Sequence, residues 1–339
     1  MSSKLPFCAV VTGIGSYVPE RVLTNMDLEK MVDTSDEWIV SRTGIRERHI
    51  LEDGKATSDM AKEAVSRALA DAKVESESID AVICATYTGD LVFPSTACLL
   101  QSKLELGTAA CFDIEAACCG FIYGLSVGAN FLESGMYKRV LVIGADASSR
   151  ALDWDDRNTC VLFGDGAAAV VLEARPVPDD DKERRGLLAS YLRSDGNGWS
   201  QLHQPAGGSQ NPPSHETVDG RQHYIKMKGR EIFKVAGKAM AEAGVVVTKQ
   251  AGLEMEDIDL VVPHQANMRI IQATKRRLGL EDDKVIINID KYGNTVAASI
   301  GIALDEAYRQ GRVKDGANIL LVGFGAGYTW GGSVIRWGR

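Results

Sequence analysis

The sequence contains no apolar run of the roughly 18 to 20 residues that a membrane-spanning helix needs, and its N-terminus has no long apolar core followed by a cleavage site. Its seven cysteines form no CxxC pair and no zinc-ligand pattern with histidine, which argues against a disulfide framework and a metal site. A net charge of −8 argues against general nucleic-acid binding. We therefore expect a cytoplasmic protein with reduced thiols, no metal, and no membrane or nucleic-acid partner.

The composition that is present is typical of a globular enzyme. The 339 residues are 45% hydrophobic and 25% charged, which is too apolar a mixture for a disordered chain. Strand-like apolar runs alternate with alanine-rich helical stretches along the whole chain. This alternation predicts an α/β fold with one large layered domain or two smaller ones.

The two halves of the chain carry matching apolar segments. The run ending at Gly144 matches the run ending at Gly323 at an offset of 179 residues, and an Ile-Asp pair ahead of each run matches at the same offset. We therefore predict two copies of one α/β unit. These are residues 1–175 and 223–339, joined by connecting and insertion loops at 176–222, which are rich in Pro, Asp, Gly and Ser.

Each half also contains a helix with small residues on one face. Gly120, Gly124 and Gly128 recur every four residues, and Ala297 and Gly301 have the same spacing in the second half. We expect both helices to be buried between two sheets, with their backbones close to one another. The sequence therefore predicts a five-layer αβαβα sandwich.

Three polar residues stand where α/β folds place their functional sites. Cys118 opens the glycine-faced helix, where free N–H groups and the helix dipole favour the thiolate, whereas Cys119 points about a quarter turn away. His264 follows a strand, and Asn294 lies in the loop that corresponds to the cysteine loop. Each residue alone also has a structural interpretation. The cysteine could be buried packing, the histidine ring could be hydrogen-bonded to a backbone carbonyl, and the asparagine could serve as a turn or helix cap. Together at one edge of a duplicated fold they indicate catalysis.

A glycine-rich turn, GFGAG, follows the last long strand. A dinucleotide-binding GxGxxG interpretation fails on spacing, and only twelve residues remain after Gly327. The functional interpretation is a tight turn that directs a backbone N–H toward a reacting carbonyl, and the structural one is a strand-to-strand turn.

The motifs AACCGF, HQAN, GFGAGYTWG, the GNT loop and TSDEWIVSRTGIRERHI together resemble the β-ketoacyl-acyl-carrier-protein synthase III family, from about residue 9 to the end of the chain. The resemblance implies a thiolase-like fold and a homodimer. It also implies the decarboxylative condensation of an acyl-CoA, expected to be acetyl-CoA, with malonyl-acyl carrier protein at the start of fatty-acid synthesis.

The resemblance assigns roles to individual residues. It implies that Cys118 is the nucleophile and that His264 and Asn294 complete a catalytic triad. Backbone N–H groups of Cys118 and Ala326 would form the oxyanion hole. No cofactor is implied, because acyl-CoA is a substrate.

The resemblance also implies contacts with coenzyme A. Trp38 and Arg42 match a pair that sandwiches the adenine, and Arg157 matches another adenine contact. Gly229 and Asn267 match residues that line the pantetheine tunnel. Stacking of tryptophan and arginine on an aromatic base is physically reasonable.

Two further surfaces are expected to contact proteins. Phe93 matches a residue that reaches across the dimer to close the acyl pocket. Because acyl carrier protein is acidic and this chain is itself negative, docking requires a local basic patch. We predict that patch at Lys234, Arg269 and Arg276.

The chain departs from the family pattern at three places. Cys119 stands where a smaller residue is usual, Ala326 replaces a usual glycine, and residues 176–222 are longer than typical. The third departure leaves the acyl-chain preference open.

Other functions also remain open on the sequence. A same-fold enzyme could make a polyketide or quinolone precursor or only transfer acyl groups, and a pocket sequence cannot separate these products. The intact Cys118, His264 and Asn294 argue against a non-catalytic partner subunit. Hydroxymethylglutaryl synthases need a glutamate base and thiolases a second cysteine in the C-terminal turn, which GFGAG lacks.

Overall fold

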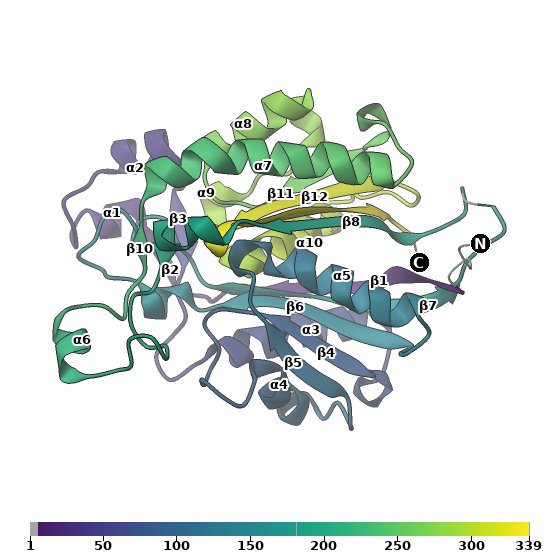
Figure 1. Cartoon of the computed structure of the whole chain (residues 1–339), viewed down its shortest axis with the longest axis horizontal. Helices are drawn as coiled ribbons and strands as arrows, with labels where there is room; N and C mark the ends of the chain where they lie inside the picture. The colour runs from purple at the N-terminus through teal and green to yellow at the C-terminus, as the bar shows by residue number, and fades with distance from the viewer. Residues whose placement is uncertain (1–5, 181, 339) are drawn as a thin grey trace.

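The computed structural model describes residues 6–180 and 182–338, which form two sheets with helices between and around them (Figure 1). The first sheet has the strand order β1-β7-β6-β4-β5 and the second has the order β11-β12-β13-β8. The strands of the first sheet are β1 (Phe7–Tyr17), β4 (Ala81–Ala85), β5 (Ala110–Ile114), β6 (Arg139–Asp146) and β7 (Gly166–Pro176). Those of the second are β8 (Gly186–Ser194), β11 (Leu260–Pro263), β12 (Asn318–Gly325) and β13 (Thr329–Arg336).

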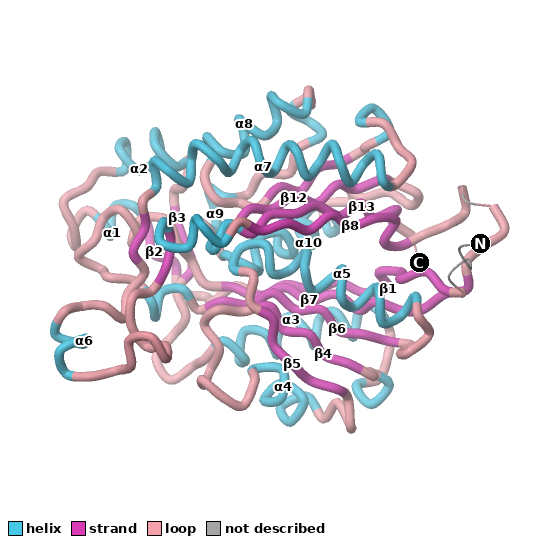
Figure 2. The backbone as a smooth tube through the Cα atoms, in the orientation of Figure 1, coloured by secondary structure: helices cyan, strands magenta, loops and turns pink. Residues whose placement is uncertain are grey.

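The helices complete five layers (Figures 1 and 2). Between the sheets lie α5 (Gly120–Glu133) and α10 (Ser299–Arg309). The outer face of the first sheet carries α3 (Thr57–Ala72) and α4 (Thr96–Leu104), and that of the second carries α7 (Gly229–Gln250) and α8 (Met268–Leu278). The predicted αβαβα sandwich is therefore confirmed.

The shorter elements lie mainly at the end of the sandwich away from the chain termini (Figure 1). They are β2 (Val22–Thr24), α1 (Asn25–Leu28), α2 (Asp36–Thr43), β3 (Glu47–His49), β9 (Leu202–His203), α6 (His215–Asp219), β10 (Lys226–Met227) and α9 (Ile289–Tyr292). Short 3-10 turns are η1 (Ser76–Ser78), η2 (Ala117–Cys119), η3 (Ser148–Ala151), η4 (Gly196–Gln201), η5 (Met255–Asp257), η6 (Asp282–Lys284), η7 (Val296–Ala298) and η8 (Ala326–Tyr328). Within the part of the chain that the structure describes, no helix is both long and apolar enough to cross a membrane.

The duplication predicted from the sequence is confirmed by the topology. The strands β1 and β8, β4 and β11, and β6 and β12 begin 179 residues apart. Corresponding strands also pair in the same order and direction, with the β6–β4 and β12–β11 pairs parallel and the others antiparallel. The counterpart of β5 is reduced to a single parallel bridge between Val261 and Val285.

The expected loop segment 176–222 needs a correction. Residues 186–194 form β8, the edge strand of the second sheet, so the second unit begins there rather than at residue 223. At the start of β8, Gly186 has a φ of 93°, and a Cβ atom at this position would collide with the backbone carbonyl of Ala9. This close approach places β8 against the first sheet. A local sequence pattern does not predict such a contact, because the two segments are far apart in the chain.

The small residues of α5 and α10 serve only partly the expected purpose. A Cβ atom at Gly124 would lie 2.8 Å from Val142 of β6, and one at Gly301 would collide with Ala168 of β7. Gly124 and Gly301 therefore let each helix approach the first sheet. The expected approach of the two helices is seen at their starts, where a Cβ atom at Gly120 would lie 3.5 Å from that of Ala297. The ring of Phe121 fills space beside Gly301, between the two helices.

Candidate active site

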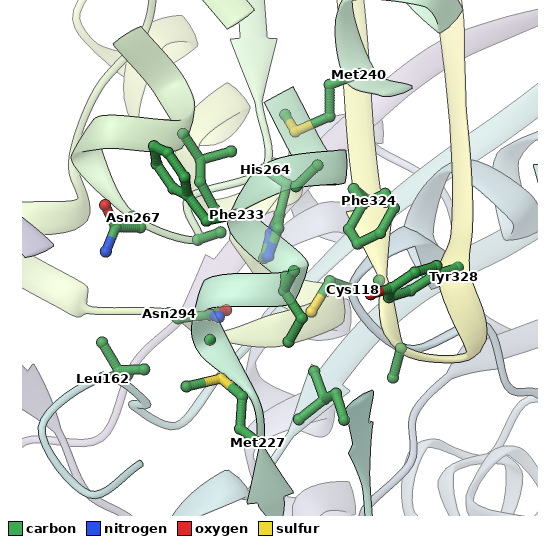
Figure 3. A pocket seen from close by; sticks show the side chains of 18 of the residues that line it. Cys118, Leu162, Met227, Phe233, Met240, His264, Asn267, Asn294, Phe324 and Tyr328 are labelled. Carbon is green, nitrogen blue, oxygen red and sulfur yellow. The ribbon is translucent and has the colours of Figure 1, made fainter. Parts of the chain in front are cut away.

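A cavity of about 110 Å³ lies where the carboxyl ends of β11 and β12 meet the start of α5 (Figure 3). Figure 3 shows the side chains of Cys118, His264 and Asn294 converging on one space. Six of the residues singled out in the sequence line this cavity, namely Cys118, Gly229, His264, Asn267, Asn294 and Ala326. Among the described residues, no group of His, Cys, Asp and Glu could hold a metal ion.

Cys118 sits in η2, immediately before α5 begins at Gly120, and is 5% exposed. The turn depends on a left-handed Ala117, whose φ is 46°. Burial, together with the negative charge of Asp146, raises the pKa of the Cys118 thiol well above its usual range. This desolvation opposes the stabilisation of the thiolate that we expect from the helix start.

Cys119 does not line the cavity. It is fully buried in the core between the sheets, and a Cβ atom at Gly323 of β12 would lie 3.3 Å from its sulfur. The two neighbouring thiols therefore face different environments, as the helical geometry predicts.

His264 follows β11 and is 1% exposed. Its Nδ1 lies 2.6 Å from Ser299 Oγ, and the backbone N–H of Gln265 donates to the same hydroxyl oxygen at 3.4 Å. When this hydroxyl donates to Nδ1, Nε2 is the protonated ring nitrogen, and this is the tautomer in which the ring donates into the cavity. Burial lowers the pKa of His264 to about 3, so the ring is neutral and acts as a donor through Nε2.

Asn294 is held by its backbone and by its own side chain. Its N–H donates to Leu162 O at 2.8 Å, and its carbonyl accepts from Gly164 N at 3.0 Å. Its Oδ1 accepts from Val296 N at 2.9 Å. Because Oδ1 is engaged in this way, the Nδ2 amide hydrogens are the groups that remain to donate into the cavity.

The glycine turn lies directly against the backbone of the cysteine. A Cβ atom at Gly325 would lie 2.8 Å from Cys118 N and 3.0 Å from Ala116 O. Thr329 Oγ1 donates to Ala116 O at 2.9 Å and ties the two turns together. Ala326, the next residue of the turn, lines the cavity beside Cys118.

The three residues expected to bind adenine lie together on the surface. The guanidinium carbon of Arg42 is 5.6 Å from the centroid of the Trp38 ring, and that of Arg157 is 5.0 Å from it. Trp38 and Arg42 belong to α2, whereas Arg157 donates to Asp33 O at 2.7 Å. The structure therefore assembles this cluster from two distant segments of the chain.

Asn267 connects the adenine cluster to the cavity. Its Oδ1 accepts from Arg269 N at 2.9 Å and caps α8, and its Nδ2 donates to Arg42 O at 3.1 Å. The side chain therefore has a structural role while it also lines the cavity, as does Gly229 at the start of α7.

The three basic residues predicted to dock the carrier protein are exposed on α7 and α8. Lys234 pairs with Glu231 at 2.9 Å, and Arg269 donates to Ser41 O at 3.0 Å. Arg276 is exposed in the last turn of α8. Because Glu231 offsets the charge of Lys234, this surface is less positive than the three basic residues alone would make it.

A second cavity of about 740 Å³ also reaches Cys118 and shares Phe163, Leu202 and Ala326 with the first. Sequence reasoning missed the residues that shape it, because most are apolar and come from separate segments. They include Tyr87, Phe163, Trp199, Leu202, Ile225 and Val296. Phe93 is 83% exposed and lies outside this wall, whereas its neighbour Val92, 99% exposed, contributes to it.

Two polar residues that support the site also escaped sequence reasoning. Ser299 orients His264, and Asp146 is a fully buried carboxylate at the end of β6. The signal for Asp146 was available, since an acidic residue that ends a strongly apolar strand needs hydrogen-bond donors.

The duplicated five-layer fold, with a buried cysteine between the two units, defines a thiolase-like enzyme. Comparison with known proteins then gives the family. A family model described as 3-oxoacyl-[acyl-carrier-protein] synthase III matches residues 112–196, and one described as the C-terminal part of that enzyme matches residues 248–337. The chain is 56% identical over 331 residues to the β-ketoacyl-[acyl-carrier-protein] synthase III of Caldanaerobacter subterraneus, with 98% of both chains covered. The chain therefore belongs to the β-ketoacyl-acyl-carrier-protein synthase III family and is a condensing acyltransferase.

Solved structures agree with this assignment. The 3-oxoacyl-[acyl-carrier-protein] synthase III of Aquifex aeolicus is 46% identical, with a TM-score of 0.88 over 97% of this chain and 100% of the other. The corresponding enzyme of Pseudomonas aeruginosa is 43% identical, with a TM-score of 0.88 over 98% and 99%. A priming β-ketosynthase from a polyketide biosynthetic pathway is 33% identical, with a TM-score of 0.89 over 99% and 98%.

Proposed function

We propose that this enzyme condenses an acyl-CoA, with acetyl-CoA as the expected substrate, with malonyl-acyl carrier protein to give a 3-oxoacyl-acyl carrier protein. The observation that carries the proposal is the convergence of Cys118, His264 and Asn294 on one buried cavity. The reaction would initiate fatty-acid synthesis in the cytoplasm and would pass through an acyl-cysteine. It needs no cofactor, since acyl-CoA is consumed as a substrate.

The first half-reaction transfers the acyl group to Cys118. The sulfur forms a bond to the thioester carbonyl carbon as the thiol loses its proton, and backbone N–H groups of Cys118 and Ala326 stabilise the oxyanion. The bond to the CoA sulfur then breaks, and the CoA sulfur takes up the proton that the Cys118 thiol lost.

The second half-reaction forms the new carbon–carbon bond. The malonyl thioester loses carbon dioxide, and the electron pair of the broken bond gives an enolate. Its oxygen accepts hydrogen bonds from His264 Nε2 and Asn294 Nδ2, which are neutral donors in a dry cavity. The enolate carbon attacks the acyl carbon, and the released Cys118 sulfur takes up a proton.

Coenzyme A would bind from the adenine cluster inward. The adenine would stack between Trp38 and the Arg42 guanidinium, with Arg157 as a further contact. Both guanidinium groups lie over the Trp38 ring in the structure, so they would move aside to admit the base. The pantetheine would then pass Asn267 and Gly229, which line the cavity that ends at Cys118.

The second cavity suits the acyl group, and a second copy of the chain would complete it. Val92 and Phe93 are almost fully exposed, at 99% and 83%, in a loop beside this cavity. Exposed apolar residues of this size mark protein contacts. We propose a homodimer in which Phe93 of one copy closes the acyl pocket of the other.

Carrier-protein docking would use Lys234, Arg269 and Arg276. Phe233 and Ile270, the sequence neighbours of two of them, line the cavity, so this surface surrounds the entrance to the site. A negative carrier protein would be steered there against the overall charge of −8. Lys234→Glu with Arg269→Glu should therefore weaken condensation and leave acylation by a small acyl-CoA unchanged. Equal loss in both half-reactions would instead assign the patch to coenzyme A.

One specific observation favours a second candidate, a priming enzyme for another acyl product. The second cavity of about 740 Å³ is far larger than an acetyl group needs, and the polyketide priming enzyme shares this fold. The test is incubation with a panel of acyl-CoA thioesters, read by intact mass. Preference for acetyl-CoA supports fatty-acid initiation, and preference for long or branched chains supports the second candidate.

Peptide mapping after digestion tests the nucleophile, and rates of the two half-reactions test its partners. Acylation should add its mass to the peptide that carries Cys118, and Cys118→Ser should abolish it while Cys119→Ser retains it. His264→Ala and Asn294→Ala should keep acyl transfer but lose decarboxylation by about 10²- to 10³-fold. A variant of either residue that condenses at near wild-type rate would disprove its role.

A further inference from the structure

Asp146 links the two halves of the molecule beneath the proposed active site. It ends β6 and is completely buried. Its Oδ1 accepts hydrogen bonds from Thr86 Oγ1 at 3.1 Å, Tyr87 N at 3.0 Å and Thr88 Oγ1 at 3.0 Å. Its Oδ2 accepts from Ala297 N at 3.0 Å, across 151 residues of sequence. The carboxylate thus connects the β4 loop of the first unit to η7 of the second.

The donors around Oδ1 have little freedom to point elsewhere. Thr88 N donates to Thr86 Oγ1 at 3.1 Å, and Ala147 N donates to Thr88 Oγ1 at 2.8 Å. Because each hydroxyl oxygen already accepts a hydrogen bond, each gives its own hydrogen to Asp146. Three fixed donors therefore meet one carboxylate oxygen, and the other oxygen faces Ala297.

The turn that Asp146 holds is the one that orients Asn294. Val296 N donates to Asn294 Oδ1 at 2.9 Å, and the next backbone N–H, that of Ala297, donates to Asp146. Val296 has a φ of 49°, a conformation that a β-branched residue adopts only when its surroundings enforce it. The bond from Ala297 to Asp146 anchors this strained turn one residue beyond the N–H that orients Asn294.

We propose that Asp146 is a positioning residue for decarboxylation, which fixes the 296–297 turn and thereby directs the Asn294 amide toward the enolate oxygen. This inference rests on the proposed function, in which Asn294 donates to the enolate. The role requires a carboxylate, because both oxygens must accept hydrogen bonds, Oδ1 from residues 86–88 and Oδ2 from Ala297.

Asp146 should favour decarboxylation through Asn294, but its negative charge disfavours ionisation of Cys118. Burial raises the pKa of Asp146 to about 7, so the group is mainly ionised at pH 8. Its negative charge contributes to the raised pKa of the Cys118 thiol. Removal of that charge should therefore make Cys118 ionise more easily, whereas loss of the Ala297 bond should impair decarboxylation.

The variant that separates these effects is Asp146→Asn. Its amide oxygen satisfies the three donors around Oδ1, which leaves its amide NH₂ facing the N–H of Ala297. We expect unprimed decarboxylation of malonyl-acyl carrier protein to fall on the order of 10²-fold, because small displacements of a catalytic donor have effects of this size. Alkylation of Cys118 by iodoacetamide at pH 8 should be at least as fast as in the wild type.

The matched control is Asp165→Asn. Asp165 is also completely buried and accepts hydrogen bonds from Leu51 N and Ser149 N, both at 2.8 Å, and from Ser149 Oγ, so its recorded partners lie outside the 296–297 turn. A selective loss of decarboxylation in Asp146→Asn but not in Asp165→Asn supports the proposal. The proposal would be overturned if decarboxylation fell equally in the two variants. It would also be overturned if decarboxylation and Cys118 alkylation fell together in Asp146→Asn.

A double-mutant cycle shows whether Asp146 acts through Asn294. Adding Asp146→Asn to Asn294→Ala should cause no further loss of decarboxylation, whereas independent losses would multiply and contradict the proposal. If Asn294→Ala alone decarboxylates normally, the proposed function of Asn294 fails. If Asn294→Ala is impaired and Asp146→Asn is not, only the present inference fails. Should Asp146→Asn not fold, Thr86→Val removes one donor to the carboxylate, and it should reduce decarboxylation without slowing alkylation.

Discussion

Substitution of Gly325 by alanine tests how closely the oxyanion turn must approach the nucleophile. The added methyl group would lie 2.8 Å from Cys118 N, 3.0 Å from Ala116 O and 2.9 Å from Thr329 Oγ1. The threonine side chain can rotate away, but the first two atoms belong to the backbone of the cysteine turn. Either the 325–326 turn or the Cys118 amide must therefore move.

The size of the effect follows from this geometry. Overpacking of this kind costs about 1 to 3 kcal/mol of folding stability. Loss of one well-placed oxyanion donor reduces the rate by about 10²- to 10³-fold. Because Cys118 N and Ala326 N are both displaced relative to the acyl carbonyl, we expect a loss of this size in acylation.

Acylation should be followed by intact mass after rapid mixing with acetyl-CoA. The control is Gly327→Ala, two residues along, where a Cβ atom would meet no atom within 4 Å although φ is 71°. That change costs about 1 to 2 kcal/mol of backbone strain without displacing Cys118 N. If Gly325→Ala acylates at a rate similar to that of Gly327→Ala, the proposed contact between the glycine turn and the oxyanion site is wrong.

Three further predictions follow from the same site. Ser299→Ala should free His264 Nδ1 to take the ring proton and slow decarboxylation about tenfold, in line with one hydrogen bond; an unchanged Nε2–H signal in ¹⁵N-histidine NMR would contradict this. Burial lowers the pKa of His264 in the folded protein from 6.5 to about 3. Below pH 6.5 the unfolded chain therefore binds more protons than the folded protein, and the free energy of unfolding decreases as the pH is lowered. Relative to His264→Asn, the wild type should lose about 2 kcal/mol between pH 7 and 5 in urea titrations, and parallel stability curves would refute the buried neutral ring. Phe93→Ala should change the acyl-CoA preference while leaving the acylation site on Cys118, and an unaltered preference would remove Phe93 from the acyl pocket.

The sequence by itself determined the duplicated fold and the three residues that meet in the cavity. Apolar periodicity sets strand and helix types locally, and an equal offset between two halves implies equal topology. Cys118 and Asn294 stand at corresponding turns of the two units, and His264 follows a strand of the second. Their meeting at one edge was therefore predictable without coordinates, because strand ends converge in such a fold.

Only the tertiary structure decided the protonation states and the supporting contacts. The raised pKa of Cys118 and the lowered pKa of His264 both come from burial by segments distant in sequence. The hydrogen bond from Ala297 to Asp146 joins residues 151 positions apart. The strand β8 lies in a segment whose composition predicts loops. Desolvation and long-range pairing depend on what surrounds a residue in space, whereas a sequence pattern reports only its neighbours along the chain.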